Sequence, residues 1–169
     1  MKQLKIALDL DDTIFDFFGE YKKLFPGEHN LVSSKITKNV YKLKENKSFW
    51  ENLPILERPN FEPYIYATKR INSKVYTKNC LIKYNLPIKP IYQIYHQLGN
   101  KANIIKGHCD VLIDDSITNV MQAINSGLPA LIIDRPHNQT DDPVFRIYSL
   151  DLEEIIEAYK LELDTLGWN

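Results

Sequence analysis

The chain has 169 residues, of which 44% are hydrophobic and 25% are charged, and its formal net charge is -1. This length allows one domain with a sizeable core and a small insertion, but not two full domains. The near-neutral charge argues against a nucleic-acid polymer as partner, because binding the phosphate backbone requires a broad basic surface. No apolar run approaches the ~20 residues that span a bilayer, so we expect a cytoplasmic protein with no membrane partner.

The first predicted element is a short buried strand over residues 4–8, which ends at Asp9. Two helical patterns follow before any second strand. The first runs from 15 to 25 and stops at a Pro-Gly pair, and the second starts at Ser33 or Ser34 and runs to about residue 45. A connector with three prolines, residues 53–63, then leads back to the sheet.

Strands and helices alternate through the rest of the chain. Strands are predicted at 64–67, 91–95, 111–113 and 130–133, with an edge strand at 145–148, and helices at about 73–84, 101–106 (a short helix or turn), 118–125 and 152–163. This alternation predicts a doubly wound, mostly parallel, Rossmann-like α/β sheet. We expect residues 1–14 and 59–169 to form the core, with residues 15–58 inserted after the first strand as a small helical cap.

Two acidic stretches directly follow predicted strands: Asp9-Leu10-Asp11-Asp12-Thr13 and Asp114-Asp115-Ser116. The carboxyl ends of parallel strands share one edge of the sheet, where open α/β sheets bind ligands, so the two stretches can meet. Clustered carboxylates repel one another unless a cation lies between them. Mg²⁺ is the natural candidate because it takes oxygen ligands and is usually completed by a substrate phosphate. The sequence therefore predicts a Mg²⁺ site that includes Asp9, Asp11 and Asp114.

A carboxylate beside a metal can attack phosphorus and form an aspartyl-phosphate. We assign Asp9 as this nucleophile and Asp11 as the acid and base that protonates the leaving group and then deprotonates water. Thr68, at the end of another strand, and Lys101 can stabilise the charge on the phosphoryl oxygens. Taken singly, a threonine such as Thr68 is more commonly a packed strand end and a lysine such as Lys101 a solvated surface residue; only their order along the chain favours the functional interpretation.

These motifs resemble the four ordered motifs of the haloacid dehalogenase-like phosphohydrolases: the first acidic stretch, Thr68, Lys101, and Ile113-Asp114-Asp115, each in its place near a strand. Within that superfamily, Phe49-Trp50-Glu51-Asn52-Leu53-Pro54 and His137-Asn138-Gln139 are similar to segments of the 5′(3′)-deoxyribonucleotidases. The resemblance to the superfamily covers the whole chain in order, and the second resemblance, to the nucleotidases, implies a small-molecule nucleoside monophosphate as substrate.

The resemblance also implies roles for further residues. Mg²⁺ would be bound by Asp9, Asp114 and the backbone carbonyl of Asp11. Thr68, Lys69 and Lys101 would hold the phosphate, and Phe17, Phe49 and Trp50 would line the nucleobase pocket. Asp115 could support the metal ligands or cap the next helix.

Several alternatives stay open at this point. Lys106 competes with Lys101 as the phosphate lysine, and Phe18 competes with Phe17 as a pocket residue. The substrate could instead be a sugar phosphate or another small metabolite, since the cap is where such enzymes differ. A non-enzymatic phospho-switch is a third option, disfavoured because a cap interrupts the sheet. A homodimer is a further expectation, and the base preference and the 5′ or 3′ position of the phosphate are not specified by the residues.

Overall fold

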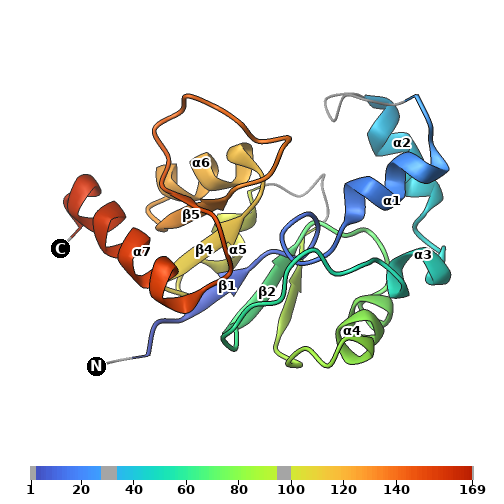
Figure 1. The fold of residues 1–169 in the computed structure, drawn as a ribbon, viewed down its shortest axis with the longest axis horizontal. Helices are drawn as coiled ribbons and strands as arrows, with labels where there is room; N and C mark the ends of the chain where they lie inside the picture. Colours follow the sequence, from blue (N-terminus) through green and yellow to red (C-terminus); the bar gives the residue numbers. More distant parts are fainter. Residues whose placement is uncertain (1–2, 28–33, 95–99, 169) are drawn as a thin grey trace.

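The computed structural model describes residues 3–27, 34–94 and 100–168 of the chain. In this part of the chain a sheet of six strands carries helices on both of its faces (Figure 1). The elements in order are β1 (Ile6–Leu8), α1 (Phe17–Leu24), α2 (Ser34–Lys42), α3 (Lys47–Glu51), β2 (Ile65–Thr68), α4 (Lys74–Lys83), β3 (Ile91–Gln93), α5 (Lys101–Ile105), β4 (Val111–Asp114), α6 (Ile117–Asn125), β5 (Ala130–Ile133), β6 (Arg146–Ile147) and α7 (Leu152–Leu166).

The strands run in the order β3-β2-β1-β4-β5-β6, and every neighbouring pair is parallel. This order is typical of doubly wound sheets and confirms the predicted fold class. Strand β1 lies at the centre, where Leu8 is in register with Tyr66 of β2 and Ile113 of β4. The residues that follow these three strands therefore lie side by side at one edge of the sheet.

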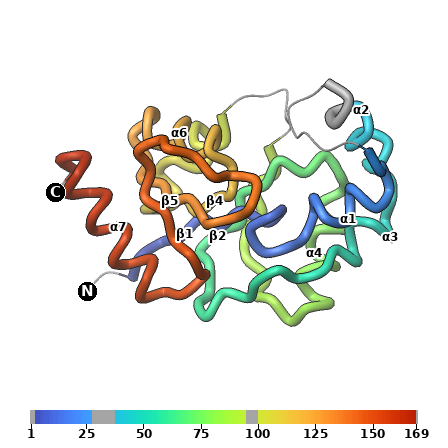
Figure 2. The backbone as a smooth tube through the Cα atoms, turned by 45° about the horizontal axis from the view of Figure 1, so that its top comes forward, coloured from blue at the N-terminus to red at the C-terminus, as the bar shows by residue number. Residues whose placement is uncertain are grey.

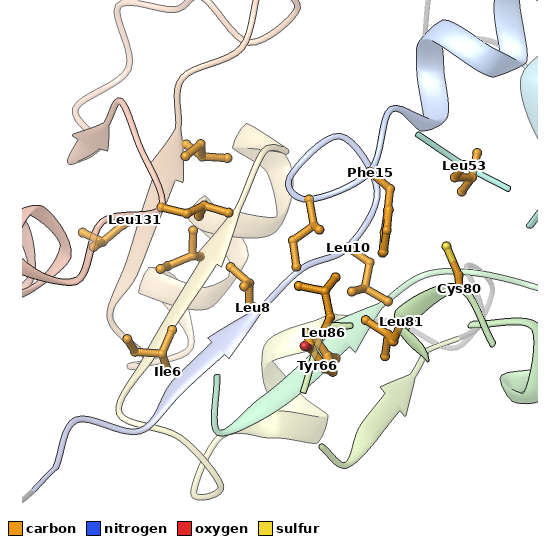
Figure 3. Packing of buried hydrophobic residues seen from close by; sticks show 14 of the residues in the cluster. Ile6, Leu8, Leu10, Phe15, Leu53, Tyr66, Cys80, Leu81, Leu86 and Leu131 are labelled. Atoms are coloured by element: carbon orange, nitrogen blue, oxygen red, sulfur yellow. The ribbon is translucent and has the colours of Figure 1, made fainter. Parts of the chain in front are cut away.

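The two faces of the sheet bury alternate residues of each strand, as a parallel sheet covered on both sides requires. Ile6 and Leu8 pack with residues of α4 and α7, and Figure 3 shows them beside Leu131 and Leu81. Ala7 faces the other side and packs in a second cluster with residues of α5 and α6. Figure 2 accordingly shows α7 and α6 on opposite sides of β4 and β5. None of the described helices is long and apolar enough to cross a membrane.

Helices α1, α2 and α3 lie between β1 and β2 in the chain and group beyond one edge of the sheet (Figure 1). Helix α3 was not predicted, because five residues are too few to show a helical period. Its N-terminus is nevertheless defined by Asn46, whose side chain accepts a hydrogen bond from Phe49 N at 3.0 Å. Helix α1 begins at Phe17 because Asp16 caps it, accepting from Gly19 N at 2.8 Å.

Most predicted elements are found within one or two residues of their expected ends. The predicted edge strand is reduced to the two residues of β6, and α7 continues to Leu166 before Gly167 ends it with φ of 66°. Of the predicted positions, Ser33 and Tyr95 lie outside the described residues. The boundaries of the predicted cap, 15–58, remain a prediction.

One carboxyl group is buried far from the carboxyl edge of the sheet. Glu162 of α7 is 1% exposed, and its Oε1 accepts a hydrogen bond from Ala130 N at 2.9 Å. Its Oε2 has no hydrogen-bond partner among the residues that the structure describes. Burial raises the pKa of Glu162 to about 7, so the fold favours the protonated form.

We expect Glu162→Gln to make stability less dependent on pH. Because the pKa is raised in the folded state, ionisation of Glu162 destabilises the wild-type protein progressively from about pH 4.5 to above pH 7. The variant cannot ionise, so its stability should exceed that of wild type by about 1–3 kcal/mol at pH 8 and match it more closely at pH 5. Thermal unfolding at both pH values measures this difference, with Glu157→Gln, an exposed change on the same helix, as control. Equal pH dependence in all three proteins would contradict the prediction.

Candidate active site

Three strand ends meet at the carboxyl edge of the sheet. Asp9 follows β1, and its backbone N–H extends the ladder by donating to Ile113 O at 2.9 Å. Thr68 is the last residue of β2 and Asp114 the last of β4, the two strands that flank β1. A cavity of about 430 Å³ opens here. The described residues that line it are Asp9, Asp11, Asp12, Phe17, Val40, Trp50, Thr68, Lys69, Arg70, Lys101, Asp115, Ser116, Ile117, Thr118, Asn119, His137 and Asn138.

Lys101 brings one positive charge into the buried part of this edge. The side chain is 1% exposed, and its Nζ donates to Asp9 Oδ1 and to Asp114 Oδ2, both at 2.5 Å. Burial opposes the ammonium charge, but the carboxylates of Asp114 and Asp9 outweigh burial and raise the pKa of Lys101 above its ordinary value. The lysine is therefore charged and bridges the ends of β1 and β4.

The position of Lys101 follows from the start of α5. Asn100 caps this helix, with its side-chain oxygen accepting from Ala102 N at 2.8 Å and its Nδ2 donating to Ser126 Oγ at 2.8 Å. The competing lysine, Lys106, is exposed and bonds the backbone carbonyl of Ser126 instead. Of the two candidates, Lys101 is thus the one that the structure places in the cavity.

Three carboxylates surround this ammonium. One oxygen from each of Asp9, Asp114 and Asp115 lies within 4.8 Å of the others. Asp114 is further held by Asn119, whose Nδ2 donates to its two oxygens at 3.0 and 3.2 Å. Asn119 was not predicted as a site residue. It lies in the first turn of α6, five residues after Asp114.

The cluster carries more negative charge than Lys101 balances. Burial raises the pKa of Asp9 well above its ordinary value, and Asp114 and Asp115 raise it further against the opposing effect of Lys101. Burial, followed by the charge of Asp114, raises the pKa of Asp115 to about 8. A surplus of buried negative charge with only carboxylate oxygens as donors suits a hard divalent cation. Asp9, Asp114 and Asp115 could therefore hold a metal ion.

Asp11 lies in the same cavity but outside this carboxylate group. Its two oxygens accept three hydrogen bonds from Arg70, of 2.6, 2.9 and 3.0 Å. An uninterrupted extended strand would have pointed Asp9 and Asp11 to the same side, but the chain turns after Leu10, and Asp12 adopts a φ of 58°. The two acids therefore have different partners. Arg70 was not predicted as a site residue, because only the folded chain shows that it reaches Asp11.

The residues predicted to hold phosphate line the cavity beside Asp9. The Thr68 side chain is fully buried, and its Oγ1 accepts from Arg70 N at 3.3 Å, which leaves the hydroxyl hydrogen for another acceptor. Lys69 is half-buried, and burial together with the charge of Lys101 lowers its pKa. A bound anion would relieve that repulsion, so Thr68, Lys69 and Lys101 form a site suited to an anionic group.

Aromatic residues from α1 and α3 form another part of the cavity wall. The rings of Phe17 and Trp50 stack at 5.7 Å with an angle of 19°, and both line the cavity. Trp50 is 1% exposed, and its Nε1 donates to Leu43 O at 2.7 Å. Phe49 packs edge-on against both rings and is absent from the described residues that line the cavity. Phe18, the alternative to Phe17, is buried against Tyr21.

The loop after β5 closes the side of the cavity next to Asp115. His137 Nε2 lies 2.7 Å from Asp115 Oδ2, and Asn138 Nδ2 donates to Asp115 O at 2.7 Å. The Asn138 side chain is buried and also donates to Ile133 O at 2.8 Å, which ties this loop to the end of β5. Asp115 therefore binds the loop instead of capping α6, whose N-cap residue is Ser116.

Comparisons with known proteins agree with this architecture. No known family model matches the sequence, and no curated protein sequence shows significant similarity to it. Among solved structures, a haloacid dehalogenase-like family hydrolase, SP0104 from Streptococcus pneumoniae, superposes with a TM-score of 0.57 at 15% identity, over 91% of this chain and 97% of that one. The chain shares its fold. The UTR4 protein from Saccharomyces cerevisiae is similar at a TM-score of 0.50 and 11% identity, over 86% of this chain and 97% of that one.

The predicted likeness to the haloacid dehalogenase-like superfamily is thus confirmed at the level of the fold. These comparisons do not show the closer resemblance to the 5′(3′)-deoxyribonucleotidases, which stays a prediction. The roles of the individual site residues likewise remain to be argued from their geometry.

Loss of the buried ammonium should destabilise the protein strongly. Lys101→Met leaves Asp9 and Asp114 without their shared cation, and breaking a buried ion pair costs about 3–5 kcal/mol. Urea unfolding at pH 7 with a chelator present measures this loss. Lys106→Met removes a lysine from the other end of the same short helix and should change stability by no more than about 0.5 kcal/mol. Similar effects for the two variants would show that the Lys101 ion pairs do not stabilise this edge.

Proposed function

We propose that the protein is a Mg²⁺-dependent phosphomonoesterase that hydrolyses nucleoside or deoxynucleoside monophosphates. The observation that carries this proposal is the placing of Asp9: it is buried against Lys101, faces Asp114 and Asp115, and shares its cavity with an aromatic wall. The fold shared with a haloacid dehalogenase-like hydrolase supports hydrolysis as the reaction class. The 5′(3′)-deoxyribonucleotidases, which the sequence resembles, act on such substrates.

The metal ligands in this proposal are the carboxylates of Asp9 and Asp114 and the backbone carbonyl of Asp11. Asp115 lies within the same carboxylate group and is fixed by His137, so it would support these ligands. When bound, Mg²⁺ would offset the negative charges of the carboxylates and of the substrate phosphate.

The first half of the reaction transfers the phosphoryl group to the protein. Thr68, Lys69 and Lys101 hold the phosphate so that one oxygen of Asp9 faces phosphorus opposite the leaving group. The carboxylate oxygen forms a bond to phosphorus, the bond from phosphorus to the ester oxygen breaks, and the carboxyl group of Asp11 gives its proton to that oxygen. The products of this step are the free nucleoside and a phosphorylated Asp9.

The second half returns the protein to its starting state. The Asp11 carboxylate takes a proton from a water molecule, whose oxygen attacks the phosphorus of the aspartyl-phosphate. The bond between phosphorus and Asp9 breaks, inorganic phosphate leaves, and Asp11 is again protonated. Asp11 suits both tasks because it lines the cavity, with 21% of its side chain exposed, and its carboxylate lies outside the cluster around Lys101.

The aromatic wall favours a nucleotide over a sugar phosphate. The half-buried Phe17 lines the cavity with Trp50 stacked on it, and a planar base can stack on such a ring over a larger area than a non-planar sugar can. The cavity volume of about 430 Å³ lies within the range typical of small-molecule sites.

Mg²⁺ should stabilise the protein through this site. At a concentration 100 times the dissociation constant, binding contributes about 2.7 kcal/mol, which corresponds to a rise of roughly 5–10 °C in Tm for a chain of this size. Asp114→Asn removes one ligand charge with little change in shape and should lose most of this rise in thermal unfolding with and without Mg²⁺. Asp141→Asn, at an exposed position, should retain it. A full rise in Asp114→Asn would place the ion elsewhere.

Phosphate release from a panel of nucleoside monophosphates and sugar phosphates tests the activity itself. We expect release from nucleotides, a loss of at least about a thousand-fold in kcat for Asp9→Asn, and a loss of about 10²–10⁴ for Asp11→Asn. Asp141→Asn should leave the rate unchanged. Equal rates for wild type and Asp9→Asn would end the proposal, release from sugar phosphates alone would replace its substrate, and a long-lived phosphoprotein without turnover would favour a phospho-switch.

A further inference from the structure

Arg70 is an unusually enclosed cation beside the cavity. The residue is 1% exposed, and the Asp11 carboxylate to which it binds lines the cavity outside the carboxylate cluster. Arg70 Nη2 donates to Asp11 Oδ1 at 2.6 Å, and Nε lies 2.9 Å from Oδ1 and 3.0 Å from Oδ2. Two atoms of the guanidinium thus fix both the position and the plane of the Asp11 carboxylate.

The guanidinium itself packs against two aromatic rings. Its Cζ lies 5.3 Å from the ring centre of Phe15, in the loop after Asp9, and 5.4 Å from that of Trp50, in α3. The remaining nitrogen, Nη1, lies 3.4 Å from Thr77 Oγ1 of α4. The Arg70 backbone is held as well, because its carbonyl accepts from Gln93 Nε2 at 2.6 Å. Four separate segments of the chain therefore determine where this side chain lies.

We propose that Arg70 is the positioning residue for Asp11 and that, through Trp50, it links the orientation of Asp11 to the helices that wall the cavity. This inference rests on the proposed function, in which Asp11 transfers the proton. The geometry of the Arg70 contacts also indicates which carboxylate oxygen of Asp11 transfers the proton. Oδ1 receives the two shorter bonds and is the anchored oxygen, whereas Oδ2 receives only the longest one, so Oδ2 carries the proton to the leaving group and keeps its place when the proton has left.

A purely structural role for Arg70 predicts a different result from a positioning role. If Arg70 only stabilises the fold, its replacement should slow all substrates alike. If it positions Asp11, the loss should depend on how much the leaving group needs a proton. Phenyl phosphate and p-nitrophenyl phosphate are nearly equal in size, but the p-nitrophenolate ion leaves readily without a proton and the phenolate ion does not. Because the two substrates should bind the aromatic wall alike, comparing their kcat/KM values separates an effect on leaving-group departure from an effect on binding.

The experiment compares wild type, Arg70→Met, Arg70→Lys, Asp11→Asn and the double variant Arg70→Met/Asp11→Asn on both aryl phosphates. We expect Arg70→Met to lower kcat/KM for phenyl phosphate about tenfold or more beyond its effect on p-nitrophenyl phosphate. Arg70→Lys, which keeps the charge but not the two-atom contact, should show a smaller change of the same kind. In the Asp11→Asn background, Arg70→Met should add nothing. Arg58→Met, at an exposed arginine that bonds Tyr84 O, is the control.

Equal losses on the two substrates, or a double variant whose loss is the product of the two single ones, would overturn the positioning role. If Arg70→Met does not fold, Arg70→Lys decides between the same two outcomes. Failure of the proposed function looks different: wild type would then release no phosphate from either substrate in a manner that depends on Asp9, and the role of Arg70 would fall with it.

Discussion

The site depends on one electrostatic constraint: three carboxylates crowd around a single buried ammonium. Asp9, Asp114 and Asp115 cannot all keep their charges in a space with little water unless cations oppose them. Lys101 supplies one positive charge and bonds two of the three at 2.5 Å. The remaining negative charge suits a divalent cation, whereas Thr68 and the positively charged Lys69 beside the cluster suit an anionic group. Without the sheet edge beneath it, this arrangement would not persist.

The strand order of the sheet brings these charged residues together. Because β1 lies between β2 and β4, residues that are about a hundred positions apart become neighbours at one edge. Immediately after Asp9 the chain leaves the sheet and turns back, with Phe15 N donating to Leu10 O at 2.9 Å. This turn separates the partners of Asp9 from those of Asp11. One acid is paired with a lysine inside the cluster and the other with an arginine outside it, so two residues of the same type can perform two different tasks.

Much of this architecture could be predicted from the sequence, because the strands are apolar runs that end in polar residues. The order of strands and helices, and the meeting of Asp9, Thr68 and Asp114, follow from that pattern together with the rules of parallel sheets. Arg70 could not be predicted in the same way. Its contacts with Asp11 and Trp50 join segments that are distant along the chain, and no local pattern distinguishes it from an ordinary arginine after a strand. Helix α3 was missed because its cap is a single asparagine and its length is barely more than one turn.

The central claim is that Asp9 becomes phosphorylated during turnover. Mixing the protein with a nucleoside monophosphate, quenching in acid within one turnover and analysing the peptides by mass spectrometry tests this claim directly. We expect one added phosphoryl group on the peptide that contains Asp9, and borohydride reduction, which converts a phosphorylated aspartate to homoserine, should mark residue 9. The phosphoryl group should be absent when the mixture is left until hydrolysis is complete before the quench. Release of inorganic phosphate with no phosphorylated peptide, or with the phosphoryl group on Asp11 or Asp114, would contradict it.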